Sequence, residues 1–347
     1  MSTLLELPPF GPRDDARFLA EMNALSERHR SGCEAYRRIT EGMEPATCRE
    51  ELPFLHVGLF KRLDLSTTLE DVRPGRVLES SSTSGQGASQ VRLDAQSSAL
   101  QAKSSRAILA DFIGPERRPL LVLDASASLR RRGGMSARIA AAMSLQPFSE
   151  GMHFLLGDAG DPASLDWNRV LELARVHGSL LVYGFTWILW QAWVEGRPAE
   201  VQRALAGTRI HFVHSGGWKK LEAASVDRDQ FDQELLRGLA PGSKVVDYYG
   251  LVEQVGIVYP LCEEGFRHVP VWAEVLVRDP ASLACIEGEP GLLQLMNVLA
   301  LGAPYHSVLT EDLGRLVPGA CPCGRGSRRF ELLGRVPRAE IRGCANV

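Results

Sequence analysis

The chemically densest stretch of the sequence is ESSSTSGQGASQV, at residues 79–91. Backbone N–H groups and hydroxyls in such a loop can donate hydrogen bonds to phosphate oxygens. A Ser/Gly stretch can equally be a flexible linker, so both interpretations stay open from these residues alone. If the stretch is a phosphate loop, its candidate phosphate-binding residues are Ser81, Ser82, Thr83, Ser84 and Gly85.

Three later stretches offer groups that bind flat or charged ligands. HSGGWKK (214–220) contains two glycines that let a ligand approach the backbone closely. YYGLVEQ (248–254) offers a tyrosine and Glu253, and LTEDLG (309–314) offers Asp312. A tight turn or a solvated carboxylate would explain each stretch by itself. Their order gives them weight: hydroxyl loop, GGW, YGxxE, TxDLG, then GR at 334–335.

Four thiol and imidazole side chains have the types that bind zinc. Cys321 and Cys323 form a tight C-x-C turn, and LCEEGFRHVP places Cys262 six residues before His268. A Cys₃His set suits tetrahedral Zn²⁺, and four protein ligands would make the site structural. The two halves lie far apart in sequence, so the fold must bring them together; buried apolar thiols are the alternative.

Composition restricts the class of protein. The chain has 347 residues, 45% hydrophobic and 23% charged, with a net charge of −3, which allows one large domain or two. Nothing in this balance favours nucleic acid as a partner, and Arg130–Arg132 is interpreted as a solvated cluster. No apolar run approaches the roughly 20 residues of a membrane span, and the N-terminus lacks a secretory signal. With seven cysteines and no export signal, we expect a cytoplasmic enzyme without a disulfide framework.

Hydrophobic patterning predicts an α/β fold. Helical spacing occurs in residues 14–45 and 95–113, and the last third contains short, mixed or antiparallel strands. Apolar runs interpreted as strands, with helices between the later ones, occur at 120–123, 153–157, 179–185, 209–217 and 244–250. This alternation predicts a mostly parallel sheet, whose ligands bind at the carboxyl ends of the strands.

These loops, in this order along the chain, resemble those of the adenylate-forming enzymes, which include acyl-CoA ligases, adenylation domains and luciferases. SSSTSGQ is similar to the family's phosphate loop, YGLVEQ to YGxxE, TEDLG to its TGD-type motif, and GRVPRAEIRG to its hinge. GGWK and LFK (59–61) resemble in particular the LuxE-like acyl-protein synthetases of bacterial luminescence, with phenylacetate-CoA ligase as a cousin. The resemblance spans roughly residues 50–347.

This resemblance implies the large N-terminal domain of the adenylate-forming fold, with mixed, mostly parallel sheets flanked by helices and a smaller β-rich subdomain. We expect an adenylation core at 1–255, a β-rich subdomain with the zinc site at 256–334, and a hinge remnant and tail at 335–347. The usual small C-terminal domain, with its lysine, would be missing or vestigial. That expectation favours a self-acylating or partner-dependent enzyme.

The resemblance also implies roles for single residues. The nucleotide site would comprise the hydroxyl loop with Ser215, Gly216, Gly217, Tyr249, Gly250, Asp312 and Arg335. Glu253 would bind Mg²⁺, whose charge offsets that of the triphosphate of ATP. Asp312 would accept hydrogen bonds from the ribose, and Tyr249 would flank the adenine. Two positions depart from the family: Ser82 replaces a usual glycine, and Val252 replaces a frequent threonine.

The implied reaction converts a carboxylic acid and ATP into an acyl-adenylate and then a thioester. The acceptor would be Cys344 on the C-terminal tail, an acyl carrier protein or CoA, and an acyl reductase is an expected partner. An idle thiol would explain Cys344 equally well. Two alternatives stay open: an aryl-acid ligase of a secondary-metabolite pathway, and a catalytically weak adenylate-binding scaffold for a reductase.

Aromatic residues recur within YGFTWILWQAWVEG (183–196), where Trp187, Trp190 and Trp193 are spaced three apart. One helical stripe packed in the core explains this spacing most simply. The resemblance instead implies an acyl pocket in this region, lined by Phe185, Trp187 and Trp190. The pattern does not separate a fatty acid from an aromatic one.

Overall fold

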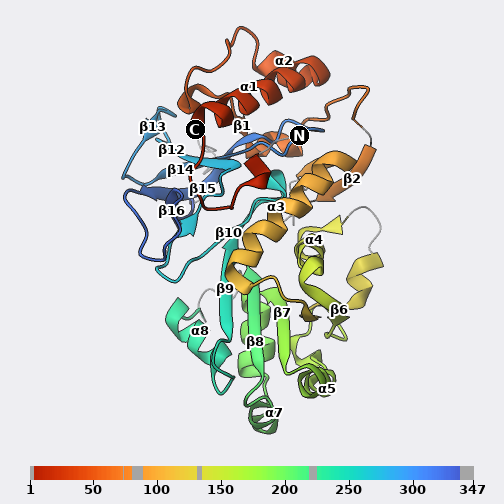
Figure 1. The fold of residues 1–347 in the computed structure, drawn as a ribbon. Helices are drawn as coiled ribbons and strands as arrows, with labels where there is room; N and C mark the ends of the chain where they lie inside the picture. The colour runs from red at the N-terminus through yellow and green to blue at the C-terminus, as the bar shows by residue number, and fades with distance from the viewer. Residues whose placement is uncertain (1–3, 73, 80–88, 131–134, 219–224, 337–347) are drawn as a thin grey trace, which may run out of the picture.

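The computed structural model describes residues 4–72, 74–79, 89–130, 135–218 and 225–336 (Figure 1). The predicted phosphate-loop residues 81–85 and the tail residue Cys344 lie outside these ranges.

A six-stranded sheet confirms the predicted parallel arrangement. Its strands run in the order β10-β9-β8-β7-β4-β6, all parallel except β10, which is antiparallel to β9. The bounds are β4 Arg118–Val122, β6 Ser149–Phe154, β7 Ser179–Phe185, β8 Arg209–Ser215, β9 Lys244–Tyr249 and β10 Tyr259–Pro260. The strand predicted at 153–157 begins earlier, because the pairing of β6 with β4 starts at Ser149.

Helices connect these strands and cover the sheet. They are α5 Trp167–His177, α6 Thr186–Ile188, α7 Ala199–Ala204 and α8 Arg228–Leu236. Each longer helix begins at a side-chain cap where the sequence supplies one: the Asp166 carboxylate accepts from the Arg169 N–H, and Asp227 accepts from Gln230. Gly178 ends α5 with a φ of 66°, a conformation that glycine adopts without strain.

The tryptophan-rich segment differs from the predicted helical stripe. After α6 the chain continues as a π-helix, η7 Leu189–Glu195, in which the Gly196 N–H donates to the Gln191 carbonyl five residues back. A three-residue spacing does not give one stripe in this wider helix. Trp190 and Trp193 nevertheless belong to a buried hydrophobic cluster that includes residues of β4, β7 and β8, which confirms that they pack in the core.

A second, seven-stranded sheet forms the C-terminal third. Its order is β11-β16-β15-β14-β12-β13, antiparallel throughout, with β1 added parallel to β15. The bounds are β1 Leu55–His56, β11 Arg267–His268, β12 Ala273–Arg278, β13 Cys285–Ile286, β14 Gly291–Asn297, β15 Ser307–Val317 and β16 Arg329–Arg335. Figure 1 shows these strands above the parallel sheet, with α3 running diagonally from beside β2 to β9 and β10. The division of the chain at residues 255 and 334 stays a prediction.

The remaining strands form a third sheet. A small sheet that the sequence did not predict has the order β3-β2-β5, with β2 Pro74–Glu79, β3 Gln90–Asp94 and β5 Met135–Ser136. The other helices are α1 Asp15–Gly32, α2 Glu34–Ile39, α3 Ala95–Ile113 and α4 Ala137–Ser144. Within the described ranges, no helix has both the length and the apolar character needed to cross a membrane.

One buried carboxylate holds distant segments together. Glu274 on β12 is fully buried, and its oxygens lie 2.6 Å from Arg13, 3.3 Å from Arg49 and 3.4 Å from Arg328. A buried charge is tolerated only when it is paired in this way. The segments that contain Arg13 and Arg49 are therefore attached to the antiparallel sheet by charge as well as by packing.

Candidate functional site

Three predicted residues form one bonded group where the two large sheets meet. Tyr249, the last residue of β9, donates its hydroxyl hydrogen to Asp312 Oδ2 at 2.7 Å. Arg335 Nε donates to the other carboxylate oxygen, Oδ1, at 2.9 Å. β15 and β16 place this pair, because Asp312 and Arg335 are directly opposite in their ladder. We call Tyr249, Asp312 and Arg335 the strand-end group.

Burial and charge shape this group. Asp312 and Tyr249 are buried, whereas the Arg335 side chain is 66% exposed and reaches the surface. Burial, and next the adjacent Asp312 carboxylate, raise the pKa of Tyr249 well above its usual range. Tyr249 therefore stays protonated and keeps donating to Asp312 at neutral pH. The carboxylate can still accept hydrogen bonds from a ligand, since each oxygen has a second lone pair.

Glu253 lies just beyond β9, in the short 3-10 turn Val252–Gln254. Its side chain is buried, and burial raises the pKa of its carboxyl, while Ser89 and then the Lys61 and Arg335 charges act in the opposite direction. Arg335 thus acts electrostatically on both Glu253 and Asp312. A bound cation would favour the ionised form of Glu253 for the same reason.

A threonine fixes the GGW loop after β8. Thr186 Oγ1 donates to the Gly216 carbonyl at 2.6 Å and lies 2.9 Å from His214 Nδ1. Gly216 has a φ of +80°, a conformation that a residue with a side chain would adopt only with strain. The loop containing Ser215, Gly216 and Gly217 is therefore held at the carboxyl end of β8, beside β9, which Gly250 follows.

Sequence reasoning did not assign two residues of this region. Thr186 follows the predicted strand β7 directly, and its place at a strand end was the only available signal. Lys61 lies in the LFK stretch and lines a cavity of about 390 Å³ together with Gln90 and Arg92.

Of the predicted acyl-pocket residues, Trp190 stacks on Phe231 at 5.9 Å and donates to Glu195 at 2.9 Å. The pocket role of Phe185, Trp187 and Trp190 stays a prediction.

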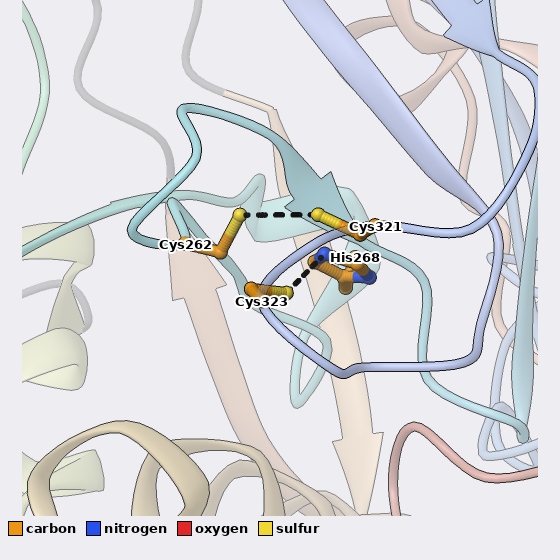
Figure 2. Close-up of side chains that lie close together, drawn as sticks. All are labelled: Cys262, His268, Cys321 and Cys323. Atoms are coloured by element: carbon orange, nitrogen blue, oxygen red, sulfur yellow. Dashed lines mark hydrogen bonds between the residues drawn. The ribbon is translucent and has the colours of Figure 1, made fainter.

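The four predicted metal ligands come together in a second region, the Cys/His cluster. Figure 2 shows Cys262, His268, Cys321 and Cys323 pointing toward one another. Their ligand atoms all lie within 4.8 Å of one another, with Cys262 Sγ 3.9 Å from Cys321 Sγ and Cys323 Sγ 3.3 Å from His268 Nε2. Two thiolates bound to a tetrahedral zinc at about 2.3 Å lie roughly 3.8 Å apart, so the spacing fits that ion. It is too long for a disulfide, whose sulfurs lie about 2.05 Å apart.

Strand pairing explains how the two halves meet. Cys262 and His268 belong to a tight turn in which the Cys262 N–H donates to the Phe266 carbonyl at 2.8 Å. Cys321 and Cys323 belong to the turn between β15 and β16, where the Gly324 N–H donates to the Cys321 carbonyl at 3.1 Å. Since β11 pairs with β16, with His268 opposite Arg329, the two turns are brought side by side.

Comparison with protein families gives a match over most of the chain. A family described as acyl-protein synthetase, LuxE, matches residues 13–347. Two proteins described as long-chain-fatty-acid–luciferin-component ligases match a shorter part. The one from Aliivibrio fischeri is 30% identical over 142 residues, covering 40% of this chain and 37% of the relative. The one from Vibrio harveyi is 29% identical over 144 residues, covering 40% and 36%. The chain therefore matches little more than a third of the length of either relative.

Solved structures share the fold. A 2-hydroxyisobutyryl-CoA ligase, in an open conformation with 2-HIB-AMP and CoA, superposes with a TM-score of 0.65 at 17% identity, covering 95% of this chain and 76% of that one. The same ligase in its thioesterification state gives a TM-score of 0.65 at 16% identity, covering 94% and 70%. The parallel sheet with its attached antiparallel sheet is thus a large portion of the acyl-CoA ligase fold.

Proposed function

The chain belongs to the LuxE acyl-protein synthetase family, and from this premise we propose that it activates a carboxylic acid with ATP and passes the acyl group to a thiol. In the first step a carboxylate oxygen of the acid attacks the α-phosphorus of ATP, and pyrophosphate leaves. In the second step a thiolate attacks the acyl carbonyl carbon, and AMP leaves. The strand-end group is the observation that supports this proposal best.

The nucleotide would be held by the carboxyl ends of β8 and β9. Asp312 would accept hydrogen bonds from the ribose hydroxyls, while Tyr249 and Arg335 hold its two oxygens at 2.7 Å and 2.9 Å. The loop fixed by Thr186 would present the backbone of Gly216 and Gly217 to the nucleotide. Because these groups are bonded before ligand arrives, little reorganisation is needed on binding.

Glu253 is the proposed ligand of Mg²⁺. A carboxylate oxygen is a ligand that Mg²⁺ prefers, and the buried Glu253 gains a stabilising charge when a cation binds. The ion would offset the charge of the triphosphate. The positive charges of Lys61 and Arg335 already favour the ionised form of Glu253, as a bound cation would.

We propose a long-chain fatty acid as the substrate. Both matched relatives carry that substrate in their descriptions, which supports a fatty acid over an aryl acid. The proposed thiol acceptors are Cys344, an acyl carrier protein or CoA, with an acyl reductase as the protein partner that receives the acyl group. Cys344 lies outside the described residues, so its role depends on the experiment below.

The Cys/His cluster is proposed to hold a structural Zn²⁺. Three sulfurs and one imidazole nitrogen supply a complete tetrahedral set, which leaves no position for substrate. The ion would join the turn after β10 to the turn before β16. Its contribution would therefore be to stability and not to the chemical steps.

Pyrophosphate release tests the proposed activity. The purified chain is incubated with ATP, Mg²⁺ and a panel of fatty and aromatic acids, and mass spectrometry of the C-terminal peptide follows acylation of Cys344. We expect pyrophosphate release with fatty acids of long chain and an added acyl mass on Cys344 when no other thiol is present. Release with aromatic acids alone would refute the fatty-acid substrate. No release with any acid would refute the activity, and release without acyl mass would exclude Cys344 as acceptor.

A further inference from the structure

The amino ends of the parallel strands form a second candidate binding region, opposite the strand-end group. Arg118, Arg209 and Lys244 are the first residues of β4, β8 and β9. They line one pocket of about 440 Å³, together with Arg117 and His211. β9 runs from Lys244 at this pocket to Tyr249 at the strand-end group. Five residue steps along a strand span about 16 Å, so the two regions are separate.

Positive charge exceeds negative charge in this pocket. Four cationic side chains and one carboxylate, Glu116, line it. Arg118 pairs with Glu116 at 3.0 Å and donates to Ser179 Oγ at 3.2 Å, so hydrogen-bond donors of its guanidinium are already used within the protein. Arg117 donates to the Ser149 carbonyl at 2.8 Å. This local excess contrasts with a chain whose net charge is −3.

Two of the cations keep free donors. Within the described residues, Arg209 makes no side-chain hydrogen bond and no ion pair. Lys244 Nζ donates one bond, to the Phe112 carbonyl at 3.1 Å, and its ammonium has three hydrogens. Both side chains are exposed at the pocket. A guanidinium and an ammonium in one pocket offer several charge-assisted donors to one ligand.

A buried histidine adds unused hydrogen-bonding capacity. His211 lies two residues after Arg209 on the same face of β8, is 5% exposed, and is opposite Lys244 in the ladder. In the described part of the chain its Nδ1 has no hydrogen-bond partner. Burial, and then the charges of Arg118, Lys244 and Arg209, lower the pKa of His211 to about 4. The ring is therefore neutral at pH 7 and retains one N–H.

We propose that this pocket binds the phosphoryl group of a small anionic molecule, with Arg209 and Lys244 as its direct contacts. A phosphoryl dianion matches the excess of cations better than a single carboxylate does, since Arg118 already has a carboxylate partner. Its several oxygens can accept from the guanidinium and the ammonium at once. The pocket is large enough to admit an organic phosphate as well as free phosphate. The proposal does not depend on the proposed function.

Thermal unfolding in the presence of two probes tests this site. Inorganic phosphate represents the free anion, and phenyl phosphate represents a phosphorylated organic molecule; sodium chloride at equal ionic strength is the control for screening. We expect at least one of the two probes to raise the melting temperature of the full chain more than the chloride control does. The stronger probe identifies the source of the phosphoryl group. If both probes only match the chloride control, the proposal is refuted.

Matched variants locate the binding. In Arg209→Gln we expect about tenfold more probe to be needed for the same rise in melting temperature, because one charge-assisted contact is lost. In the double variant with Arg209→Gln and Lys244→Gln, about a hundredfold more probe than in the wild type should be needed for the same rise in melting temperature. Arg203→Gln changes another exposed arginine, on α7, and should respond like the wild type. Asp312→Asn should also keep the full response, because it alters the other end of the sheet.

The single Arg209→Gln variant carries the test if the double variant does not fold. Lys244 bonds the end of α3, whereas Arg209 makes no bond within the described residues that its loss would break. If Arg209→Gln responds to the probe like Arg203→Gln, the pocket is not the binding site. If Asp312→Asn abolishes the response, the probe binds at the strand-end group and the proposal fails.

Discussion

The strand-end group and the Cys/His cluster both collect side chains from distant parts of the chain, but different interactions complete them. In the strand-end group each charge or hydroxyl already has a protein partner, at 2.7 Å and 2.9 Å. In the Cys/His cluster the closest contacts join thiols to each other and to an imidazole, at 3.9 Å and 3.3 Å, and thiols are weak donors. The strand-end group therefore needs no ligand to keep its shape, whereas the Cys/His cluster would gain more stability from a bound ion. Changes to the first should alter activity, and changes to the second should alter stability.

Metal removal should give the largest effect. Cys321→Ser combined with Cys323→Ser removes half of the proposed ligands, and we expect the free energy of unfolding to fall by about 5 kcal/mol. Urea unfolding and metal analysis measure the outcome. Cys285→Ser, a half-buried cysteine outside the cluster, is the matched control and should keep both zinc and stability. Less than half an equivalent of zinc in the gently purified wild type would contradict the proposal.

Replacing Glu253 should give the next largest effect, on rate. Glu253→Gln keeps the size of the side chain but removes the charge proposed to hold Mg²⁺, so pyrophosphate release should slow by about 10²–10³-fold. Because burial raises the pKa of the Glu253 carboxyl, its neutral replacement should not lower the melting temperature. A variant that loses rate and stability together would break the proposed separation between the two regions.

Within the strand-end group, Asp312 should matter more than Tyr249. Asp312→Asn weakens the charge-assisted bonds to the ribose, so the KM for ATP should rise about tenfold or more. Tyr249→Phe removes only the bond that orients the carboxylate, and we expect a rise of about fivefold. Steady-state kinetics with varied ATP gives both values. A larger effect for Tyr249→Phe would mean that the tyrosine contacts the nucleotide itself.

Acid should destabilise the protein through a third region. His306 is buried, its Nε2 lies 3.1 Å from Ser26 Oγ, and burial lowers its pKa to about 3. Its ring lies 4.8 Å from that of His29, whose pKa is also lowered, by burial and by His306. Both rings are neutral in the native protein, whereas the unfolded chain gains protons below about pH 6.5. The stability present above that pH is therefore lost as the pH falls toward 3.

At pH 5 one such histidine should lower the free energy of unfolding by about 2 kcal/mol relative to pH 7. Urea midpoints from pH 7 to pH 4.5 measure this slope, and His306→Gln should flatten it. The experiment shows at which pH the protein begins to lose stability. Activity that is lost while the protein is still folded can then be attributed to the strand-end group. An unchanged slope in His306→Gln would place the acid sensitivity elsewhere.

The sequence predicted the elements whose signals are local. Five apolar runs identified β4, β6, β7, β8 and β9; the predicted Gly216 lies in the loop after β8, and the predicted Tyr249 is the last residue of β9. Asp312 lies in the middle of β15 and was found only through its motif. Helix patterning also located α3 correctly, from Ala95 to Ile113.

Features set by long-range pairing could not be predicted from local signals. β11 has only two residues, Arg267 and His268, yet its pairing with β16 assembles the Cys/His cluster. The residue types indicated the ligand set, but the cluster's geometry depends on that ladder. Thr186 binds Gly216 across neighbouring strands, thirty positions away. The three-residue tryptophan spacing indicated an α-helix, whereas backbone hydrogen bonds to the fifth preceding residue made a π-helix.

The ion network around Glu274 has a consequence for the order in which the protein matures. Arg13 leaves the ribosome well before its buried partner Glu274, which is 261 positions further along the nascent chain. Until β12 has been translated, Arg13 and Arg49 cannot complete their charge pairing, and the apolar face of α1 has no finished sheet to cover. The N-terminal segment should therefore dock only after β12 has emerged, and a chaperone that shields it until then should increase the yield of active protein.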